Sequence, residues 1–293
     1  MNEVFFIMKR TADVSQFAPM FRCPLCGSSM DAASGKSLIC TERGHTFDRS
    51  RHGYVNFLTK RVKTGYDAGL FEARSRLIGE CRFFEPLHHA IADLISHPNS
   101  GEEAFTILDS GCGEGSHLNA LCGFDYAGKA AMGAGIDLSK DGIVKASKAF
   151  KDQMWAVADV ACAPFHDRQF DVVLSIFSPS NYAEFHRLLK DDGMLIKVVP
   201  RKDYLIELRQ FLYTDSPRRT YSNTAAVERF TANVERSHQA RLRYVKTLNR
   251  QAIHWLLQMT PLAWSAPKDR VSLLKEMKSA DITVDVDILI GMK

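Results

Sequence analysis

The feature that most constrains this chain is an apolar strand that runs directly into a glycine-rich turn. The strand is predicted from Phe105, and the turn reads Asp109-Ser-Gly-Cys-Gly-Glu-Gly115. In an open parallel sheet, ligands bind beyond the carboxyl ends of the strands, and the first turn must let the backbone approach the ligand closely. Gly111, Gly113 and Gly115 permit that approach. The pattern therefore predicts a nucleotide-type cofactor site at this turn.

The sequence around and after the turn alternates between apolar strands and helices. A helix is expected at 141–150 with Ser139 as its N-cap. Strand and helix in succession are typical of a parallel, doubly wound α/β sheet. Strands are predicted at 105–109, 133–137, 154–158, 170–177 and 194–199. Later elements are predicted as helices at 203–213, 250–258 and 268–279, strands at 237–248 and 281–290, and a polar insertion near 214–235.

The spacing of the glycines distinguishes between possible cofactors. A nicotinamide dinucleotide site requires G-x-G-x-x-G, and its third glycine would fall at Ser116. Glu114 would repel a pyrophosphate, whereas S-adenosylmethionine (AdoMet) carries two cationic groups. Asp137 is placed to accept from the ribose hydroxyls, and Asp159 from the adenine amino group. These residues, with Asp109 and the glycines, predict a class I AdoMet-dependent methyltransferase, Rossmann-like and mostly parallel.

Three of the seven cysteines cluster near the start of the chain. Cys23, Cys26 and Cys40 form the pattern C-x2-C-x13-C-x4-H with His45. The first pair, Cys23 and Cys26, forms a knuckle that directs two thiolates at one ion, and the second pair, Cys40 and His45, can close a tetrahedron around Zn(II) that leaves no position for water. The pattern predicts a small N-terminal domain held by one structural zinc per chain. Two free buried cysteines or a redox pair are the alternative, and His52 is a second candidate for the fourth ligand.

The charge of the chain is unevenly distributed. Between Arg22 and Arg82 there are eleven Lys or Arg against six Asp or Glu, although the whole chain has a net charge of only +4. A basic front end favours a polyanion as partner, and a solvated basic surface is the alternative. The candidate phosphate contacts are Arg49, Arg51, Lys60, Arg61 and Lys63, and Tyr54 and Phe57 are placed either to stack a base or to form core. Because no apolar run is long enough for a membrane span, we expect a cytoplasmic protein with no membrane partner.

Five sequence motifs point to a family. They are the zinc knuckle followed by His45-Thr-Phe-Asp48, then Gly53-Tyr-Val-Asn56, Leu108 to Gly115, Phe177-Ser-Pro-Ser-Asn-Tyr182 and Met259-Thr-Pro-Leu262. With these motifs the chain, from about Phe21 onward, resembles the RlmA-type 23S ribosomal RNA guanine-N1 methyltransferases. Phe177 to Tyr182 and Leu195-Ile-Lys-Val-Val-Pro200 are more similar to the Gram-positive, tylosin-resistance branch than to the enterobacterial one.

The resemblance implies methyl transfer to N1 of a guanine in the hairpin 35 loop of 23S rRNA, a zinc domain that helps to recognise the RNA, and a homodimer. Matching the family's cofactor contacts position by position adds Phe84, His117, Leu118 and Tyr204 to the AdoMet site. Phe84 stands where a tyrosine is usual, and Tyr204 where a histidine is usual. The expected organisation is an extension at 1–20, a zinc-binding RNA-recognition domain at 21–60, a helical linker at 61–98 and the methyltransferase domain at 99–293.

Ser178 and Asn181 are the candidate catalytic residues. They lie in the loop after the fourth strand, where the target base should meet the methyl group. A structural turn followed by a helix N-cap is the alternative role for both. Two other functions compete: a methyltransferase for a small molecule, with the zinc unit as a lid or dimer contact, and a non-catalytic RNA-binding protein of the same fold. The basic front end argues against the former, and the intact Asp109 and Asp137 argue against the latter.

Overall fold

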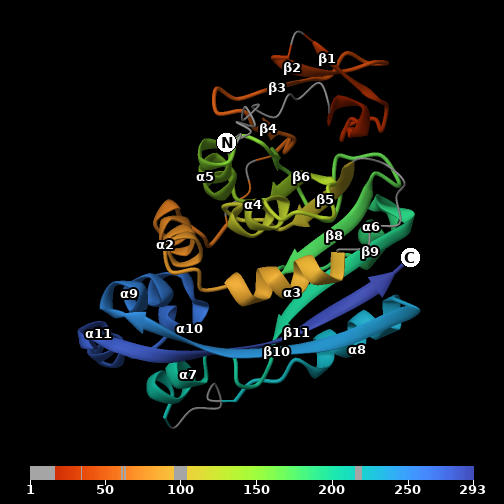
Figure 1. The fold of residues 1–293 in the computed structure, drawn as a ribbon. Coiled ribbons are helices and arrows are strands. Elements are labelled where there is room, and N and C mark those ends of the chain that lie inside the picture. Colours follow the sequence, from red (N-terminus) through yellow and green to blue (C-terminus); the bar gives the residue numbers. More distant parts are fainter. Residues whose placement is uncertain (1–16, 34, 61, 63, 96–103, 215–219) are drawn as a thin grey trace, which may run out of the picture.

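A large sheet forms the centre of the computed structural model, which describes residues 17–33, 35–60, 62, 64–95, 104–214 and 220–293 (Figure 1). Among these residues the sheet has eight strands in the order β10-β11-β9-β8-β5-β6-β7-β4. Their bounds are β4 Val55–Asn56, β5 Ala104–Ser110, β6 Ala130–Asp137, β7 Met154–Val157, β8 Phe170–Ile176, β9 Leu189–Pro200, β10 Arg236–Asn249 and β11 Ser279–Met292.

The strand order reverses beside β5, which lies between β6 and β8. β5 is parallel to both neighbours, and β7 and β9 continue the parallel arrangement on either side. β11 is antiparallel to β9, and β10 is antiparallel to β11. A reversal of this kind opens a crevice at the carboxyl ends of the strands. The predicted doubly wound, mostly parallel α/β sheet is confirmed, with a strand at each of the five predicted places.

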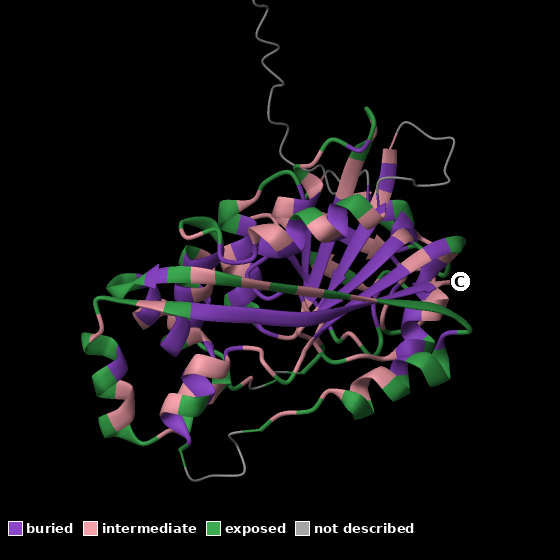
Figure 2. Cartoon of the chain, turned by 60° about the horizontal axis from the view of Figure 1, so that its bottom comes forward, coloured by how far each residue is buried: buried purple, intermediate pink, exposed green. Residues whose placement is uncertain are grey.

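Helices cover both faces of the sheet, and the central strands between them are almost wholly buried (Figure 2). Side chains of α3, α4, α5 and α9 belong to one core, and those of α6 and α8 belong to the other. The helices are α2 Ala68–Gly79, α3 Glu85–Ile95, α4 Ser116–Cys122, α5 Lys140–Ala149, α6 Tyr182–Leu188, α7 Ile206–Leu212, α8 Thr224–Asn233, α9 Arg250–Met259, α10 Pro261–Trp264 and α11 Lys268–Glu276.

Side-chain caps determine where the helices nearest the crevice begin. Asp67, Ser139 and Asn181 each accept a hydrogen bond from the backbone N–H three residues further on, at the starts of α2, α5 and α6. The helical run expected within the linker at 61–98 consists of two helices. Arg82, between them, has a φ of 50°, which a right-handed helix cannot accommodate.

A second, three-stranded sheet lies at one end of the molecule (Figure 1). It follows a 3-10 helix at Ala18–Met20 and consists of β1 Met30–Ala33, β2 Ser37–Cys40 and β3 Thr46–Asp48. The ring of Phe21 stacks on Phe165 of the large domain, with centroids 4.8 Å apart. β4 pairs parallel with β7, placing Val55 opposite Ala156. The N-terminal unit therefore contributes an edge strand to the large sheet.

The region after Asp203 contains the expected helices α7, α9 and α11 and the expected strands β10 and β11. Within the polar insertion near 214–235 the structure adds α8, which buries Phe230. β10 forms one edge of the sheet and alternates between exposed and half-buried residues (Figure 2). Among the described residues, none of the helices has the length and apolar character needed to span a bilayer.

Candidate functional site

The glycine turn follows β5 and has a backbone that glycine adopts readily. Gly111, Gly113 and Gly115 have φ values of 83°, 58° and 82°. A Cβ atom on Gly111 would lie 2.6 Å from the Cβ atom of Ser178, and one on Gly113 would lie 2.7 Å from Nη1 of Arg74. A side chain at Gly111 would collide with Ser178, and one at Gly113 would have to displace the Arg74 guanidinium, so the turn presents bare backbone to its surroundings.

Asp109 and Asp137 end the adjacent strands β5 and β6, on the two sides of this turn. Asp109 is buried, and its Oδ2 atom has no hydrogen-bond partner. Burial, partly opposed by the charge of Arg74, raises the pKa of Asp109 to about 7. Asp137 accepts from the backbone N–H of Gly113 at 2.9 Å and from that of Ser139 at 2.7 Å. Asp137 therefore fixes the glycine turn to the end of β6.

Asp159 and Glu114, the other two acidic residues of the predicted site, lie in different surroundings. Asp159 follows β7, is exposed, and accepts from the backbone N–H two residues further on at 2.8 Å. Glu114 is wholly buried, and its Oε2 atom lies 3.1 Å from Nε of Arg74. Because Arg74 compensates this charge, Glu114 repels a pyrophosphate less than the sequence suggests. The glycine spacing is thus the stronger reason to exclude a dinucleotide.

Phe84, His117 and Tyr204, expected from the resemblance, form a series of ring contacts with Phe177, in which His117 contacts Phe84. Ring centroids are 5.2 Å apart for Phe84 and His117, 5.5 Å for Phe84 and Phe177, and 5.4 Å for Phe177 and Tyr204. Nδ1 of His117 lies 2.8 Å from Nε2 of His88. Burial lowers the pKa of His117 far below its usual value and that of His88 to about 4, so both rings are neutral.

These residues fit AdoMet. Oδ2 of Asp109 and Nε2 of His117 are buried polar atoms without a protein partner, and such atoms call for a ligand or water. Leu118, the next residue of α4, is fully buried, and the rings around Phe177 supply apolar surface. An apolar wall with a few unsatisfied polar groups is typical of a small-molecule site.

The loop after β8, where the methyl acceptor is expected, is held from several sides. Phe177 has a φ of 54°, which is unusual for an aromatic residue. Ser178 donates from Oγ to the carbonyl of Ser110 at 2.7 Å, and its own carbonyl accepts from Nζ of Lys197 at 3.1 Å. Asn181 caps α6. Both candidate catalytic side chains therefore have the structural partners that the alternative role requires.

Two cations near the site were not predicted, namely the buried Lys197 and the half-buried Arg74. Burial lowers the pKa of Lys197 to about 8, and its Nζ atom also donates to Ser175 at 3.3 Å. A signal for Lys197 existed, because it interrupts an apolar strand that is central in the sheet. Arg74 gave no signal, since α2 carries several other charged residues that face solvent.

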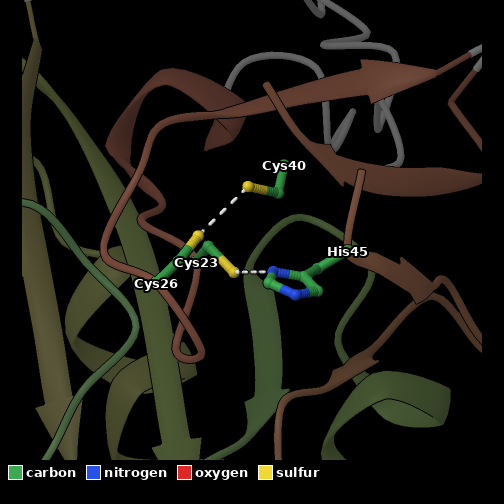
Figure 3. A group of neighbouring side chains, drawn as sticks. All are labelled: Cys23, Cys26, Cys40 and His45. Carbon is green, nitrogen blue, oxygen red and sulfur yellow. Dashed lines mark hydrogen bonds between the residues drawn. The ribbon is translucent and has the colours of Figure 1, made fainter. Parts of the chain in front are cut away.

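The four predicted zinc ligands converge, with their sulfur and nitrogen atoms directed toward one another (Figure 3). All four ligand atoms lie within 4.8 Å of one another. Sγ of Cys23 is 3.3 Å from Nδ1 of His45, and Sγ of Cys26 is 3.3 Å from Sγ of Cys40. A tetrahedral zinc with Zn–S bonds of about 2.3 Å needs ligand separations of roughly 3.8 Å, so the cluster fits this ion. His52 lies elsewhere, accepting from Arg51.

The candidate RNA contacts are only partly within the described chain. Arg61 and Lys63 lie outside the described residues. Lys60 and Arg51 are exposed, whereas Arg49 is half-buried and donates to a backbone carbonyl four residues away. The exposed pair can reach a phosphate without rearrangement.

Tyr54 and Phe57 are core residues. They are 7% and 3% exposed, and they pack in the two main cores of the protein. The alternative that they form core, rather than stack a base, is therefore the one that the structure favours.

Comparison with known proteins agrees with this geometry. Residues 21–64 match a family model described as the N-terminal zinc ribbon of RlmA, and residues 107–193 match a methyltransferase domain model. The chain is 88% identical, over 98% of its length and all of the relative, to the protein YxjB of Bacillus subtilis (strain 168), whose name proposes a 23S rRNA (guanine-N(1)-)-methyltransferase.

Two more distant relatives carry similar names. A protein of Micromonospora griseorubida, whose name proposes the same activity, is 30% identical over 91% of this chain and 94% of its own length. The 23S rRNA (guanine(748)-N(1))-methyltransferase of Streptomyces fradiae is 31% identical over 86% of this chain and 88% of its own length. Together with the sheet topology, the glycine turn and the zinc cluster, these matches show that the chain belongs to the RlmA-type 23S rRNA (guanine-N1)-methyltransferases, AdoMet-dependent enzymes with a structural zinc.

Proposed function

We propose that this enzyme transfers the methyl group of AdoMet to N1 of a guanine in the hairpin 35 loop of 23S rRNA, in the cytoplasm. The observation that carries the proposal is the match along most of the chain to the Streptomyces fradiae relative, whose name specifies guanine 748 and N1. The zinc ribbon at 21–64 supports the proposal, because the family model that matches these residues describes the N-terminal unit of RlmA.

The proposed cofactor site combines the carboxyl ends of three parallel strands with two helices and the loop after β9. Asp109 receives the ammonium group of AdoMet, Asp137 the ribose hydroxyls and Asp159 the adenine amino group. The residues assigned to the cofactor are Phe84, Asp109, Gly111, Gly113, Gly115, His117, Leu118, Asp137, Asp159 and Tyr204. Support comes from the register of the sheet, in which Asp109 and Ser110 of β5 pair with Gly135 and Ile136 of β6, just before Asp137.

The proposed reaction requires an unpaired guanine. N1 lies on the pairing edge of the base and carries a proton, so the base must leave its stack before N1 can align with the methyl group. A loop makes this movement less costly than a duplex does. As the bond from N1 to carbon forms, the bond from carbon to sulfur breaks and N1 loses its proton. Alignment of the two reactants supplies most of the rate acceleration.

We assign that alignment to the loop at 178–181. Ser178 lies against Gly111, which brings the loop next to the cofactor turn. Because Ser178 and Asn181 already hold hydrogen bonds within the protein, their side chains act first by fixing the loop. Lys197 supports the same loop by donating a hydrogen bond from Nζ to the carbonyl of Ser178. The loop is thus a rigid platform for the base.

The proposed RNA-binding unit is the zinc domain with its basic residues. Lys60, Arg61 and Lys63, with Arg49 and Arg51, contact phosphates, and the zinc holds the fold that presents them. We further infer a homodimer, which light scattering on the purified protein checks directly: a mass of one chain, 32.9 kDa, would contradict it.

Mass spectrometry of 23S rRNA tests the assignment. N1-methylguanosine in a fragment that contains hairpin 35 is compared between a deletion strain, its parent and a strain complemented with Asp109→Asn. We expect the modification in the parent alone, because the variant loses its contact with AdoMet. Equal modification in the deletion strain and its parent would disprove the rRNA assignment. Loss of the modification at a guanine outside hairpin 35 would disprove the assignment to that loop.

A further inference from the structure

Arg74 lies over the glycine turn, although it belongs to α2, outside the methyltransferase domain expected from the sequence. Nη1 of Arg74 lies 2.7 Å from the position of a Cβ atom on Gly113, and the ring of Phe71 lies 3.3 Å from the same position. Nε of Arg74 lies 3.1 Å from Oε2 of Glu114, and the Arg74 side chain is 19% exposed. α2 therefore forms a wall of the cofactor site and directs one guanidinium at its backbone.

The charges of three carboxylates, from Glu114, Asp109 and Asp137, act on this guanidinium, and Glu114 forms an ion pair with it. Burial lowers the pKa of Arg74, but the three carboxylates raise it more, so the guanidinium stays charged. The charge of Arg74 also acts on His117 and on Tyr204: burial lowers the pKa of His117 and raises that of Tyr204, and Arg74 lowers both. Arg74 therefore lies among the residues assigned to AdoMet, rather than at the rim of the site.

The chemistry of AdoMet limits what Arg74 can meet. The amino-acid end of the cofactor has one anionic group, the α-carboxylate, and two cationic groups, the ammonium and the sulfonium. A guanidinium repels both cations and binds a carboxylate through two parallel hydrogen bonds. Asp109, with its unpartnered Oδ2 atom, offers the complementary charge to the ammonium.

We propose that Arg74 binds the α-carboxylate of AdoMet, opposite Asp109, which binds the ammonium. This inference rests on the cofactor site proposed above and names a residue of that site that the motifs do not mark. The ion pair with Glu114 holds the guanidinium in place through Nε, and this leaves the Nη1 edge, which lies over Gly113, for the ligand. The amino-acid end of the cofactor is thus recognised by two opposite charges, one from β5 and one from α2.

The competing role for Arg74 is that of a counterion that only neutralises the buried Glu114. The two roles differ in what happens when the ligand loses its carboxylate. Calorimetry without RNA measures the dissociation constants of S-adenosylhomocysteine and of its decarboxylated analogue, which keeps the ammonium. The variant Arg74→Gln/Glu114→Gln removes both charges, so that no unpaired carboxylate remains buried. Circular dichroism and the melting temperature confirm that each variant is folded.

In the unmodified enzyme we expect S-adenosylhomocysteine to bind about 10- to 100-fold more tightly than the decarboxylated analogue, as a charge-assisted bidentate contact implies. In the double variant this preference should fall below about threefold, because the group that reads the carboxylate is gone. A second variant, Arg74→Lys, keeps the positive charge beside Glu114 and should show an intermediate preference.

A preference that stays unchanged in the folded double variant would reject the proposal and leave Arg74 as a counterion. If the double variant does not fold, an unchanged preference in Arg74→Lys would do the same. Because these measurements use no RNA, they can fail while the rRNA assignment holds, and the reverse is also possible.

Discussion

At the scale of single residues, Asp109 links cofactor binding to pH. Burial raises its pKa from 3.8 to about 7, so the free enzyme takes up a proton on this carboxyl as the pH falls below about 7. The ammonium group of the cofactor requires the ionised form, and binding must then release the proton. We expect the affinity for S-adenosylhomocysteine to fall by up to about tenfold per pH unit below pH 7. Calorimetry at several pH values, in buffers of different ionisation enthalpy, measures both affinity and proton release.

The variant Asp109→Asn is the control for that prediction. Its affinity should be at least about tenfold lower at pH 8 and should no longer change near pH 7. Stability should change in the opposite direction. The folded state binds the Asp109 proton more tightly than the unfolded state, so this group's contribution to stability is lost as the pH rises from about 4 to about 7. The variant should therefore gain melting temperature at pH 8 but not at pH 4, and an equal gain at both would refute the assignment of this pKa.

Lys197 gives a second prediction at the same scale. Lys197→Met removes the donor to the carbonyl of Ser178 and to Ser175 but keeps most of the side-chain volume. Because the loop at 178–181 loses its support, we expect single-turnover methylation to slow by about tenfold or more, while the affinity for S-adenosylhomocysteine stays within about threefold. Equal losses in both measurements would mean that Lys197 supports the cofactor site or the fold as a whole. The variant Lys197→Arg, which retains a cationic donor, should recover part of the rate.

At the scale of elements, the zinc cluster supports the three short strands β1 to β3 and not the cofactor site. Cys26→Ser removes one ligand, and we expect the zinc content to fall from about one ion per chain to less than about 0.2. RNA affinity should fall by at least about tenfold, whereas S-adenosylhomocysteine affinity should stay within about threefold, because Val55 and Phe57 hold β4 through burial. The matched control is Cys162→Ser, an exposed cysteine outside the cluster. Full zinc content in Cys26→Ser would exclude Cys26 as a ligand.

Elements with a strong local pattern could be predicted from the sequence, and elements that depend on distant contacts could not. The apolar strands could be predicted because burial between two helical layers requires continuous apolar runs. The turn at 111–115 could be predicted from the spacing of its glycines. β4 is two residues long and exists only because β7 offers an edge. α8 buries Phe230 in an otherwise polar stretch, too weak a signal for a helix. Arg74 looks like one of several solvent-facing charges of α2 until the tertiary structure encloses it, whereas Lys197 is marked only by its position within an apolar strand.

At the scale of the whole molecule, charge distinguishes the zinc unit, which we propose binds RNA, from the rest of the chain. The double charge reversal Lys60→Glu/Arg61→Glu should weaken RNA binding and reduce the slope of log K against log salt by about two, since each phosphate contact releases about one counterion. Lys275→Glu/Lys278→Glu is a control with the same change in net charge, because both residues are exposed and α11, at or beside which they lie, is far from β1 to β3 (Figure 1). Filter binding at several salt concentrations gives both slopes. An equal effect of the control would indicate a general effect of net charge.

The strand β4 joins two units that the family models treat as separate. A fragment that starts after the zinc unit would uncover the backbone N–H and C=O groups of β7, and an uncovered edge of this kind pairs with other chains. A soluble catalytic fragment would therefore need residues 54–58 as well as the large domain. The same holds for chimeras: an exchange of zinc units between two relatives succeeds only if the product keeps a β4 strand, from either parent, that pairs with β7 of the recipient sheet.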